Sequence, residues 1–115
     1  MNFETLLSYL LQKPGATEDF PFDNVTLVVK VSGKMFALVG INNDPLHINL
    51  KCDPNKADFL RQQYPAVLPG YHMNKQHWNT VVLDGSIDDA EIYGMIDESY
   101  ALVVQGLPRA KRPVS

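Results

Sequence analysis

A two-residue turn, Ser32-Gly33, lies between two runs rich in β-branched and aromatic residues, and it constrains the fold more than any other feature. The runs cover residues 25–31 and 34–41. Small, flexible residues at the two central positions are typical of a tight β-hairpin turn. The sequence therefore predicts an antiparallel hairpin. Because its loop is so short, the pairing register has little freedom.

The predicted register decides which side chains of this hairpin face the core. It pairs Val31 with Lys34, Val29 with Phe36 and Leu27 with Leu38. The core side then carries Leu27, Val29, Phe36 and Leu38, and the other side carries Thr26, Val28, Lys30, Met35, Ala37 and Val39. This second side is too apolar for free solvent. Two interpretations stay open: another part of the chain covers it, or it binds a partner.

Periodicity and capping residues predict the remaining elements. A helix is expected at residues 3–13, capped by Asn2, and a second helix at residues 54–64, capped by Asp53. Residues 46–51 alternate between apolar and polar, as a half-buried strand does, while residues 16–24 are expected to form a loop. A second hairpin is predicted to start at residues 71–73, bend at 74–76 and return through 78–83. A last helix, capped by Ser86, should end at Gly106.

The predicted order of elements is αβββαββα. Neighbouring strands joined by short connections favour an antiparallel sheet, so we expect a two-layer α+β fold with the helices packed on one face. A chain of 115 residues suffices for one domain with a core of its own. We place that domain at residues 1–107 and a basic, flexible tail at residues 108–115.

Composition narrows the class of protein further. The content of 45% hydrophobic and 20% charged residues is that of a globular chain, and a single cysteine excludes an internal disulfide. There is no secretory signal pattern and no apolar run near the ~20 residues of a membrane span, so we expect a cytoplasmic protein without membrane contact. The net charge of −3 argues against strong non-specific binding to nucleic acid.

Charge is unevenly spread along the chain. Residues 84–98 carry acidic side chains and no Lys or Arg, whereas residues 47–80 carry most of the central lysines and all 3 histidines. One basic face on an acidic protein is therefore one interpretation, and ordinary solvated charge is the other.

Residues 70–80 hold the densest group of polar and aromatic side chains, but they do not form a recognisable catalytic or metal-binding set. His72 and His77 have an odd spacing, which on a continuous strand places them on opposite faces, and no cysteine or carboxylate cluster completes a metal site. Cys52 precedes a predicted helix, where a thiol can be activated, but no histidine base is adjacent in sequence. No glycine-rich phosphate loop is present. We therefore predict no metal, no cofactor and no enzymatic activity.

Several stretches resemble the MmcQ/YjbR family of small bacterial proteins. They are residues 14–22 (PGATEDFPF), 33–38 (GKMFAL), 48–54 (INLKCDP) and 64–80, so the resemblance covers nearly the whole chain. It implies a YjbR-like α+β fold. It also implies binding to duplex DNA through a paired-hairpin arrangement described as a double wing, without catalysis.

Residue chemistry fits that implied role at two hairpins. Lysine can contact phosphate, asparagine and glutamine can bond to base edges, and aromatic rings can stack on bases. The candidate DNA-binding residues are Lys30, Lys34, Lys51, His72, Asn74, Lys75, Gln76, His77 and Asn79. Alternatively, Tyr71 and Trp78 belong to the core and the asparagines form turns.

A different class of function also stays open. The chain could be a protein- or effector-binding module, or a homodimer, that uses the outer face of the first hairpin through Val28, Met35, Ala37 and Val39. The two classes need different surfaces. DNA binding needs the lysines of both hairpins on one exposed face, whereas a protein interface needs an exposed apolar face.

Overall fold

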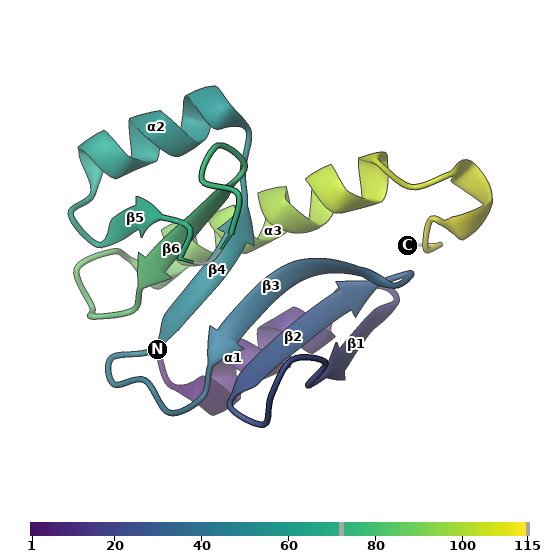
Figure 1. Cartoon of the computed structure of the whole chain (residues 1–115), viewed down its shortest axis with the longest axis horizontal. Coiled ribbons are helices and arrows are strands. Elements are labelled where there is room, and N and C mark those ends of the chain that lie inside the picture. Colours follow the sequence, from purple (N-terminus) through teal and green to yellow (C-terminus); the bar gives the residue numbers. More distant parts are fainter. Residues whose placement is uncertain (72, 115) are drawn as a thin grey trace.

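The computed structural model describes residues 1–71 and 73–114 and contains one six-stranded antiparallel sheet with strand order β1-β2-β3-β4-β6-β5 (Figure 1). The elements in chain order are α1 (Phe3–Leu11), β1 (Ala16–Asp19), β2 (Thr26–Val31), β3 (Lys34–Gly40), β4 (His47–Lys51), α2 (Pro54–Gln63), β5 (Val67–Pro69), β6 (Trp78–Val82), α3 (Asp89–Gln105) and the 3₁₀ helix η1 (Arg109–Lys111). Within the described residues, no helix is both long and apolar enough to cross a membrane.

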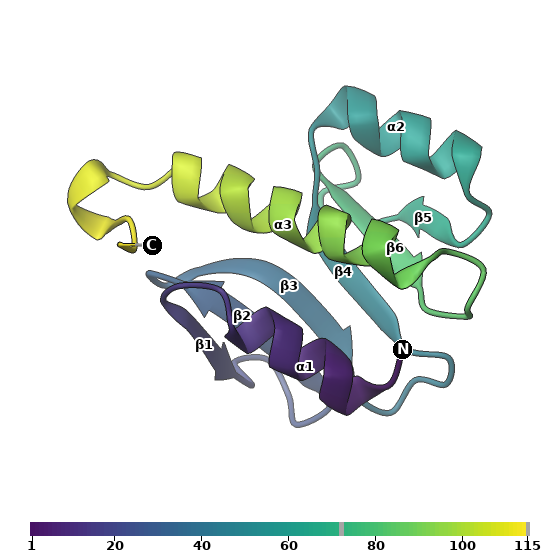
Figure 2. The ribbon, with the colours of Figure 1, turned by 180° about the vertical axis from the view of Figure 1, so that it is seen from behind.

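The three α-helices pack on one face of the sheet, as predicted for a two-layer α+β fold. Leu6 of α1, Leu60 of α2 and Ile96 of α3 belong to one buried cluster with the inward side chains of the central strands. Figure 2 shows α1 and α3 in front of the sheet when the molecule is viewed from behind. Burying the apolar stripe of each helix against the sheet is the main source of stability in such a fold.

Polar contacts join α1 to α3 at the rim of this helical layer. Lys13 forms an ion pair with Asp97, whose carboxylate also accepts a hydrogen bond of 2.7 Å from the Tyr9 hydroxyl. The Tyr9 ring stacks on Tyr93 with centroids 4.0 Å apart. Burial, followed by the hydrogen bond to Asp97, raises the pKa of Tyr9.

The order of elements is αββββαββα, so the predicted order αβββαββα lacked one strand. Residues 16–19, predicted as loop, form β1 and pair with β2, with Thr17 opposite Lys30. Two of the four residues, Glu18 and Asp19, have low intrinsic strand preference. Pairing with the edge of β2 overrides that preference, which periodicity alone does not reveal.

The β2–β3 hairpin forms at the predicted turn, but its register differs from the prediction. Ser32 and Gly33 have φ angles of 48° and 80°, as a two-residue primed turn requires, and Val31 lies opposite Lys34. A bulge between Val29 and Lys30 then shifts the pairing by one residue. Because side chains alternate between faces, the shift changes which residues are buried under the helices.

Because of this bulge, side chains of β3 face other sides of the sheet than the sequence predicts. Ala37 and Val39 point into the main core and are fully buried there, although they were predicted on the outer side. Leu38, predicted in the core, lies instead on the opposite face of the sheet with Val28.

Helix caps agree with the sequence at two of the three predicted positions. The Asn2 side chain accepts a hydrogen bond of 2.8 Å from the Thr5 amide, and the Asp53 carboxylate accepts one of 3.1 Å from the Asn55 amide. The predicted cap by Ser86 is wrong. Its hydroxyl donates to the Asp84 carboxylate instead, and α3 begins later, with Asp88 at the N-cap position.

The second predicted hairpin also differs in detail. Beside β4, the strand β5 pairs with β6, with Leu68 opposite Thr80, and among the described residues neither Tyr71 nor Met73 belongs to a strand. Residues 70, 71 and 73–77 form a long connection between β5 and β6, and the predicted hairpin's residue 72 lies outside the described part of the chain.

The C-terminal segment, for which we predict flexibility, turns back toward the β2–β3 hairpin (Figure 1). Arg112 donates from Nε to the Leu107 carbonyl at 3.0 Å, and the Ser32 hydroxyl donates to the Lys111 carbonyl at 2.5 Å. The division into a domain at residues 1–107 and a flexible tail stays a prediction.

Candidate nucleic-acid interface

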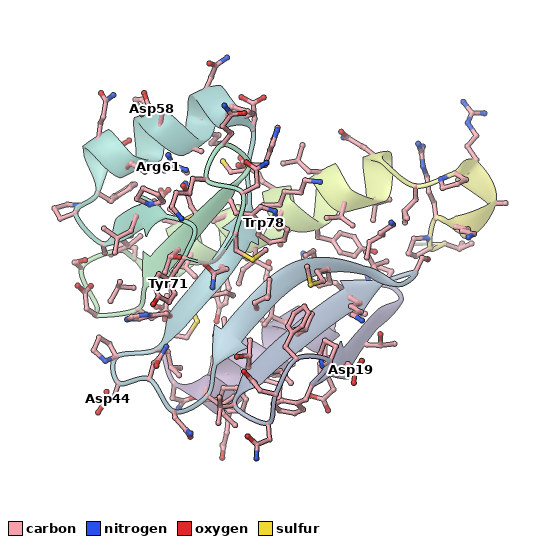
Figure 3. All side chains as sticks on the ribbon, viewed as in Figure 1. Asp19, Asp44, Asp58, Arg61, Tyr71 and Trp78 are labelled. Atoms are coloured by element: carbon pink, nitrogen blue, oxygen red, sulfur yellow. The ribbon has the colours of Figure 1, made fainter. Side chains whose placement is uncertain are left out.

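The sheet face turned away from the helices, here called the outer face, carries both apolar and charged side chains. Val28, Leu38 and Trp78 form a small buried cluster on this face, with Met35 and Met73 packed against it. Around the cluster, cross-strand pairing places Lys30 beside Met35 and Lys51 beside Trp78. Figure 3 shows Trp78 near the centre of the view, with Tyr71 and Asp19 to either side.

The loop at residues 70–77, here called the polar loop, folds against this face. The Gly70 amide donates to the Trp78 carbonyl at 2.9 Å, and the Tyr71 amide donates to the Thr80 hydroxyl at 3.0 Å. A side chain at Gly70 would meet the Trp78 Cβ atom at 2.8 Å, closer than two carbon atoms pack. Glycine at this position thus allows the loop to approach Trp78 and bring Met73 over the apolar cluster.

Arg61 of α2 holds the polar loop from the side. Its Nε donates to the Asn79 side-chain oxygen at 2.7 Å, and its Nη2 donates to the Trp78 carbonyl at 3.2 Å and to the Lys75 carbonyl (Figure 3). Within the described residues Arg61 takes part in no salt bridge. Sequence analysis did not predict this role, since nothing in the spacing of Arg61 and residues 75–79 signals it.

The four predicted lysines lie in different settings. Lys34 at the hairpin turn and Lys75 in the polar loop are exposed, while Lys30 and Lys51 are half-buried on the strands. Lys30 lies 3.7 Å from the Asp19 carboxylate, a distance at which an exposed pair contributes little. Lys75 donates to the Gly70 carbonyl at 3.1 Å, which folds its stem along the loop. Cations from both hairpin regions thus remain near solvent.

The other predicted residues divide into exposed and buried groups. Asn74, Gln76 and His77 are exposed, and the Asn74 side chain accepts a hydrogen bond of 2.9 Å from the Gln76 amide, as a turn former does. Asn79 is 2% exposed and hydrogen bonds with Arg61 and with the Ala57 carbonyl. The prediction that Asn79 contacts DNA is therefore wrong, because its buried side chain stabilises the fold instead. His72 lies outside the described residues.

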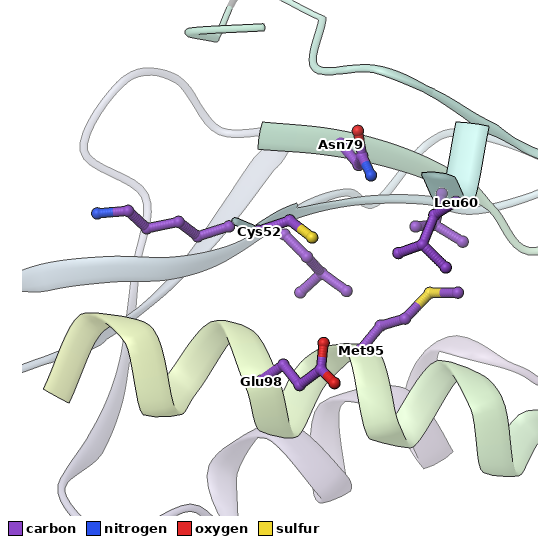
Figure 4. A pocket seen from close by; sticks show the side chains of 8 residues that line it. Cys52, Leu60, Asn79, Met95 and Glu98 are labelled. Carbon is purple, nitrogen blue, oxygen red and sulfur yellow. The ribbon is translucent and has the colours of Figure 1, made fainter. Parts of the chain in front are cut away.

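A small pocket lies on the helical side, next to Cys52 (Figure 4). It is lined by Cys52, Leu60, Asn79, Met95 and Glu98, among others, and its volume of about 10 Å³ holds about one water molecule. Burial raises the pKa of the Cys52 thiol, with the Glu98 charge acting in the same direction. A raised pKa disfavours the reactive thiolate. Among the described residues, no group of three or more His, Cys, Asp and Glu side chains is placed to hold a metal ion.

These features define a class: a small two-layer α+β protein in which helices cover one sheet face and a polar loop partly covers the other. The family model YjbR matches residues 11–102, and the chain belongs to the YjbR family. It is 42% identical over 113 residues to the protein YjbR of Escherichia coli K12, covering 97% of this chain and 95% of that one. It is 30% identical to YyaQ of Bacillus subtilis over 114 residues, covering 86% of this chain and 95% of YyaQ.

A solved structure agrees with this family and fold. The crystal structure of a Deinococcus radiodurans protein with a DUF419 domain superposes with a TM-score of 0.90 at 42% sequence identity. The match covers 95% of this chain and 83% of that one. None of these names states an activity, so function has to be argued from the outer face.

Proposed function

We propose that this protein binds duplex DNA weakly, through the β2–β3 hairpin and the polar loop. One observation carries the proposal: the helices leave the outer face uncovered, and lysines from both hairpin regions border it. Lys30 comes from the hairpin, Lys51 from β4 and Lys75 from the polar loop, whereas Lys34, opposite the core residue Val31, extends from the hairpin turn on the helical side. Lysine contacts to phosphate supply the sequence-independent part of DNA affinity.

The distribution of acidic side chains supports this orientation. Asp88, Asp89 and Glu91 lie at the N-terminal end of α3, which belongs to the helical layer on the opposite side of the sheet. Their repulsion of phosphate is therefore weakest when the outer face meets the DNA. Asp19 is an acidic side chain that borders the outer face, and it lies near Lys30.

The polar loop offers groups that can contact bases. Gln76 and His77 are exposed at its tip, and a glutamine amide can bond to an adenine edge in the major groove. Tyr71 is 69% exposed, which leaves ring surface for stacking or for contact with sugars. We propose no catalysis, metal or cofactor in this role, and we keep the cytoplasm as its expected location.

The apolar residues predicted to form a protein-binding surface on the outer face are not exposed there. Val28, Ala37 and Val39 are each fully buried, Ala37 and Val39 on the helical side. Met35 is half-buried and packs on the Trp78 cluster. The apolar residues that were to bind a partner thus serve the fold, which favours the DNA proposal for this face.

Binding isotherms at several salt concentrations test the proposal. With about three or four phosphate contacts, log K should fall with log salt at a slope of roughly −3, and Kd should lie near ~10⁻⁴–10⁻⁶ M at physiological salt. Lys30→Ala and Lys75→Ala should each weaken binding to all sequences and flatten the slope by about one unit. The matched control is Lys56→Ala, since Lys56 lies on α2 and pairs with Glu98. Equal effects of all three substitutions would contradict the assigned face.

A further inference from the structure

The segment from Thr17 to Val25 is exposed at every residue, although it contains two phenylalanines. Phe20 is 44% exposed and Phe22 is 64% exposed. The segment runs through β1, an edge strand of the sheet, and the connection to β2 (Figure 1). Large aromatic side chains beside an uncovered strand edge are a feature that soluble proteins usually avoid unless the edge is used.

Backbone groups at alternate residues of β1 point toward this edge, and those of Glu18 are the ones open to a further strand. The Ala16 amide donates to the Lys13 carbonyl at 3.0 Å, and the Phe20 amide donates to the Asp19 carboxylate at 2.8 Å. Both amides are therefore directed away from β2. Since successive backbone amides along a strand alternate in direction, the amide and carbonyl of Glu18 also face away from β2. Glu18 can thus pair with a further strand.

The opposite edge of the sheet, at β5, is closed to such pairing. The Gly70 amide donates to the Trp78 carbonyl and the Val82 amide to the Ala66 carbonyl, so Val67 and Pro69 face outward. The Val67 amide is already bonded to the Tyr64 carbonyl at 3.0 Å, and Pro69 has no amide hydrogen. Of the two sheet edges, β1 is the one that can accept a strand.

Charge indicates which kind of strand fits. Glu18 lies opposite Val29, on the helical side, whereas Asp19 lies opposite Val28, on the outer side, so carboxylates flank both sides of the edge. The neighbouring cation, Lys30, is 3.7 Å from the exposed Asp19 carboxylate and neutralises it weakly. A second copy of this chain is disfavoured, because antiparallel pairing centred on Glu18 would bring like charges together. Nucleic acid is disfavoured by the same carboxylates.

We propose that the β1 edge binds an extended, basic peptide segment of another protein by strand addition. The peptide backbone would pair with Glu18, and its apolar side chains would pack on Phe20 and Phe22. In an alternating peptide the Lys or Arg side chains all lie on one side, so they would face either Glu18 or Asp19, according to the register. This site adjoins the rim of the outer face at Asp19, which lies opposite Val28 and near Lys30. Its test uses peptides and does not depend on DNA binding.

The experiment uses the full chain and two fluorescent peptides of equal length, one alternating Lys with Val and the other alternating Glu with Val. Anisotropy should show binding of the basic peptide and none of the acidic one. Amide shifts in a ¹⁵N-labelled sample should concentrate at residues 16–25. Glu18→Pro removes the outward amide and should weaken binding about tenfold or more, whereas Glu18→Gln retains the amide and should weaken it less.

Phe22→Ser should also weaken binding, and Phe59→Ser is its matched control, because Phe59 is 60% exposed on α2, away from this edge. Four results of the peptide experiments would overturn the proposal. They are no binding at low salt, equal binding of both peptides, shifts confined to other elements, or a basic-peptide affinity that Glu18→Pro leaves unchanged. A dimer of the protein alone that Glu18→Pro dissociates would also overturn it, because the edge would then bind a second copy.

Discussion

At the scale of single residues, Trp78 links the fold to the candidate interface. It is 9% exposed, and its ring covers Val28 and Leu38 on the side of the sheet that has no helix. Its backbone carbonyl also accepts hydrogen bonds from the Gly70 amide and the Arg61 guanidinium. The polar loop therefore depends on Trp78 for both its apolar support and its backbone contacts.

Replacing Trp78 with alanine tests this dual role. Trp78→Ala should lower the free energy of unfolding by about 3–5 kcal/mol, because a large buried ring is removed from a small cluster. Chemical denaturation of the parent, Trp78→Ala and Trp78→Phe gives the comparison, with the phenylalanine variant expected between the other two. An alanine variant as stable as the parent would mean that the ring carries no packing.

Asp23 makes a pH-dependent contribution at the same scale. Its carboxylate accepts hydrogen bonds from the Val25 amide at 3.0 Å and the Thr26 amide at 2.7 Å, and the bond from Val25, more than any other contact, lowers the pKa of Asp23 below its ordinary value of 3.8. A carboxyl whose pKa is lower in the folded state stabilises the fold above the unfolded-state pKa. That contribution is lost as the pH falls through the folded-state pKa.

Thermal melts between pH 6 and pH 2 measure this contribution. The parent should lose stability below about pH 4, and Asp23→Asn should lose less over the same interval, because its amide does not titrate. Glu4→Gln, which changes an exposed carboxylate on α1, is the control and should follow the parent. If Asp23→Asn and the parent have parallel pH profiles, the carboxylate contributes no pH-dependent stability.

At the scale of elements, α2 and the polar loop form one unit through Arg61. Arg61→Met removes the hydrogen bonds to the Asn79 side chain and to the Trp78 and Lys75 carbonyls. Hydrogen bonds of a charged donor are worth about 1.5–3 kcal/mol each, so faster amide exchange is expected throughout residues 73–79. Hydrogen–deuterium exchange should show the change there and leave β1 and β2 as in the parent. Exchange that rises equally in all strands would indicate global destabilisation instead.

Elements also show where sequence reasoning succeeds and fails. Local patterns can be recognised in the sequence. They include the Ser32-Gly33 turn, the alternation of β4 and the caps by Asn2 and Asp53. The bulge between β2 and β3 and the pairing of β1 depend on contacts between segments, so neither follows from periodicity. The same holds for the candidate site. Exposure of Gln76 agrees with its polarity, whereas burial of Asn79 depends on the distant Arg61.

At the scale of the whole molecule, the two sheet faces have different charge and cover. The helical layer carries the acidic start of α3, while lysines border the outer face. The net charge of −3 is therefore distributed unequally between the two faces. Weak binding to a polyanion in one orientation needs such a difference in charge. A single sheet with one open side also explains how a chain of 115 residues keeps a large continuous core and an accessible surface.

The central claim is that the outer face meets DNA, and an NMR titration of ¹⁵N-labelled protein with a short duplex at low and moderate salt tests it most directly. The account predicts amide shifts at Lys30, Lys34, Lys51 and residues 74–77, with little change at Asp88, Asp89 and Glu91. The shifts should shrink as salt rises, since phosphate contacts release counterions. No shifts at low salt, or shifts confined to residues 108–114 or to α3, would contradict the account.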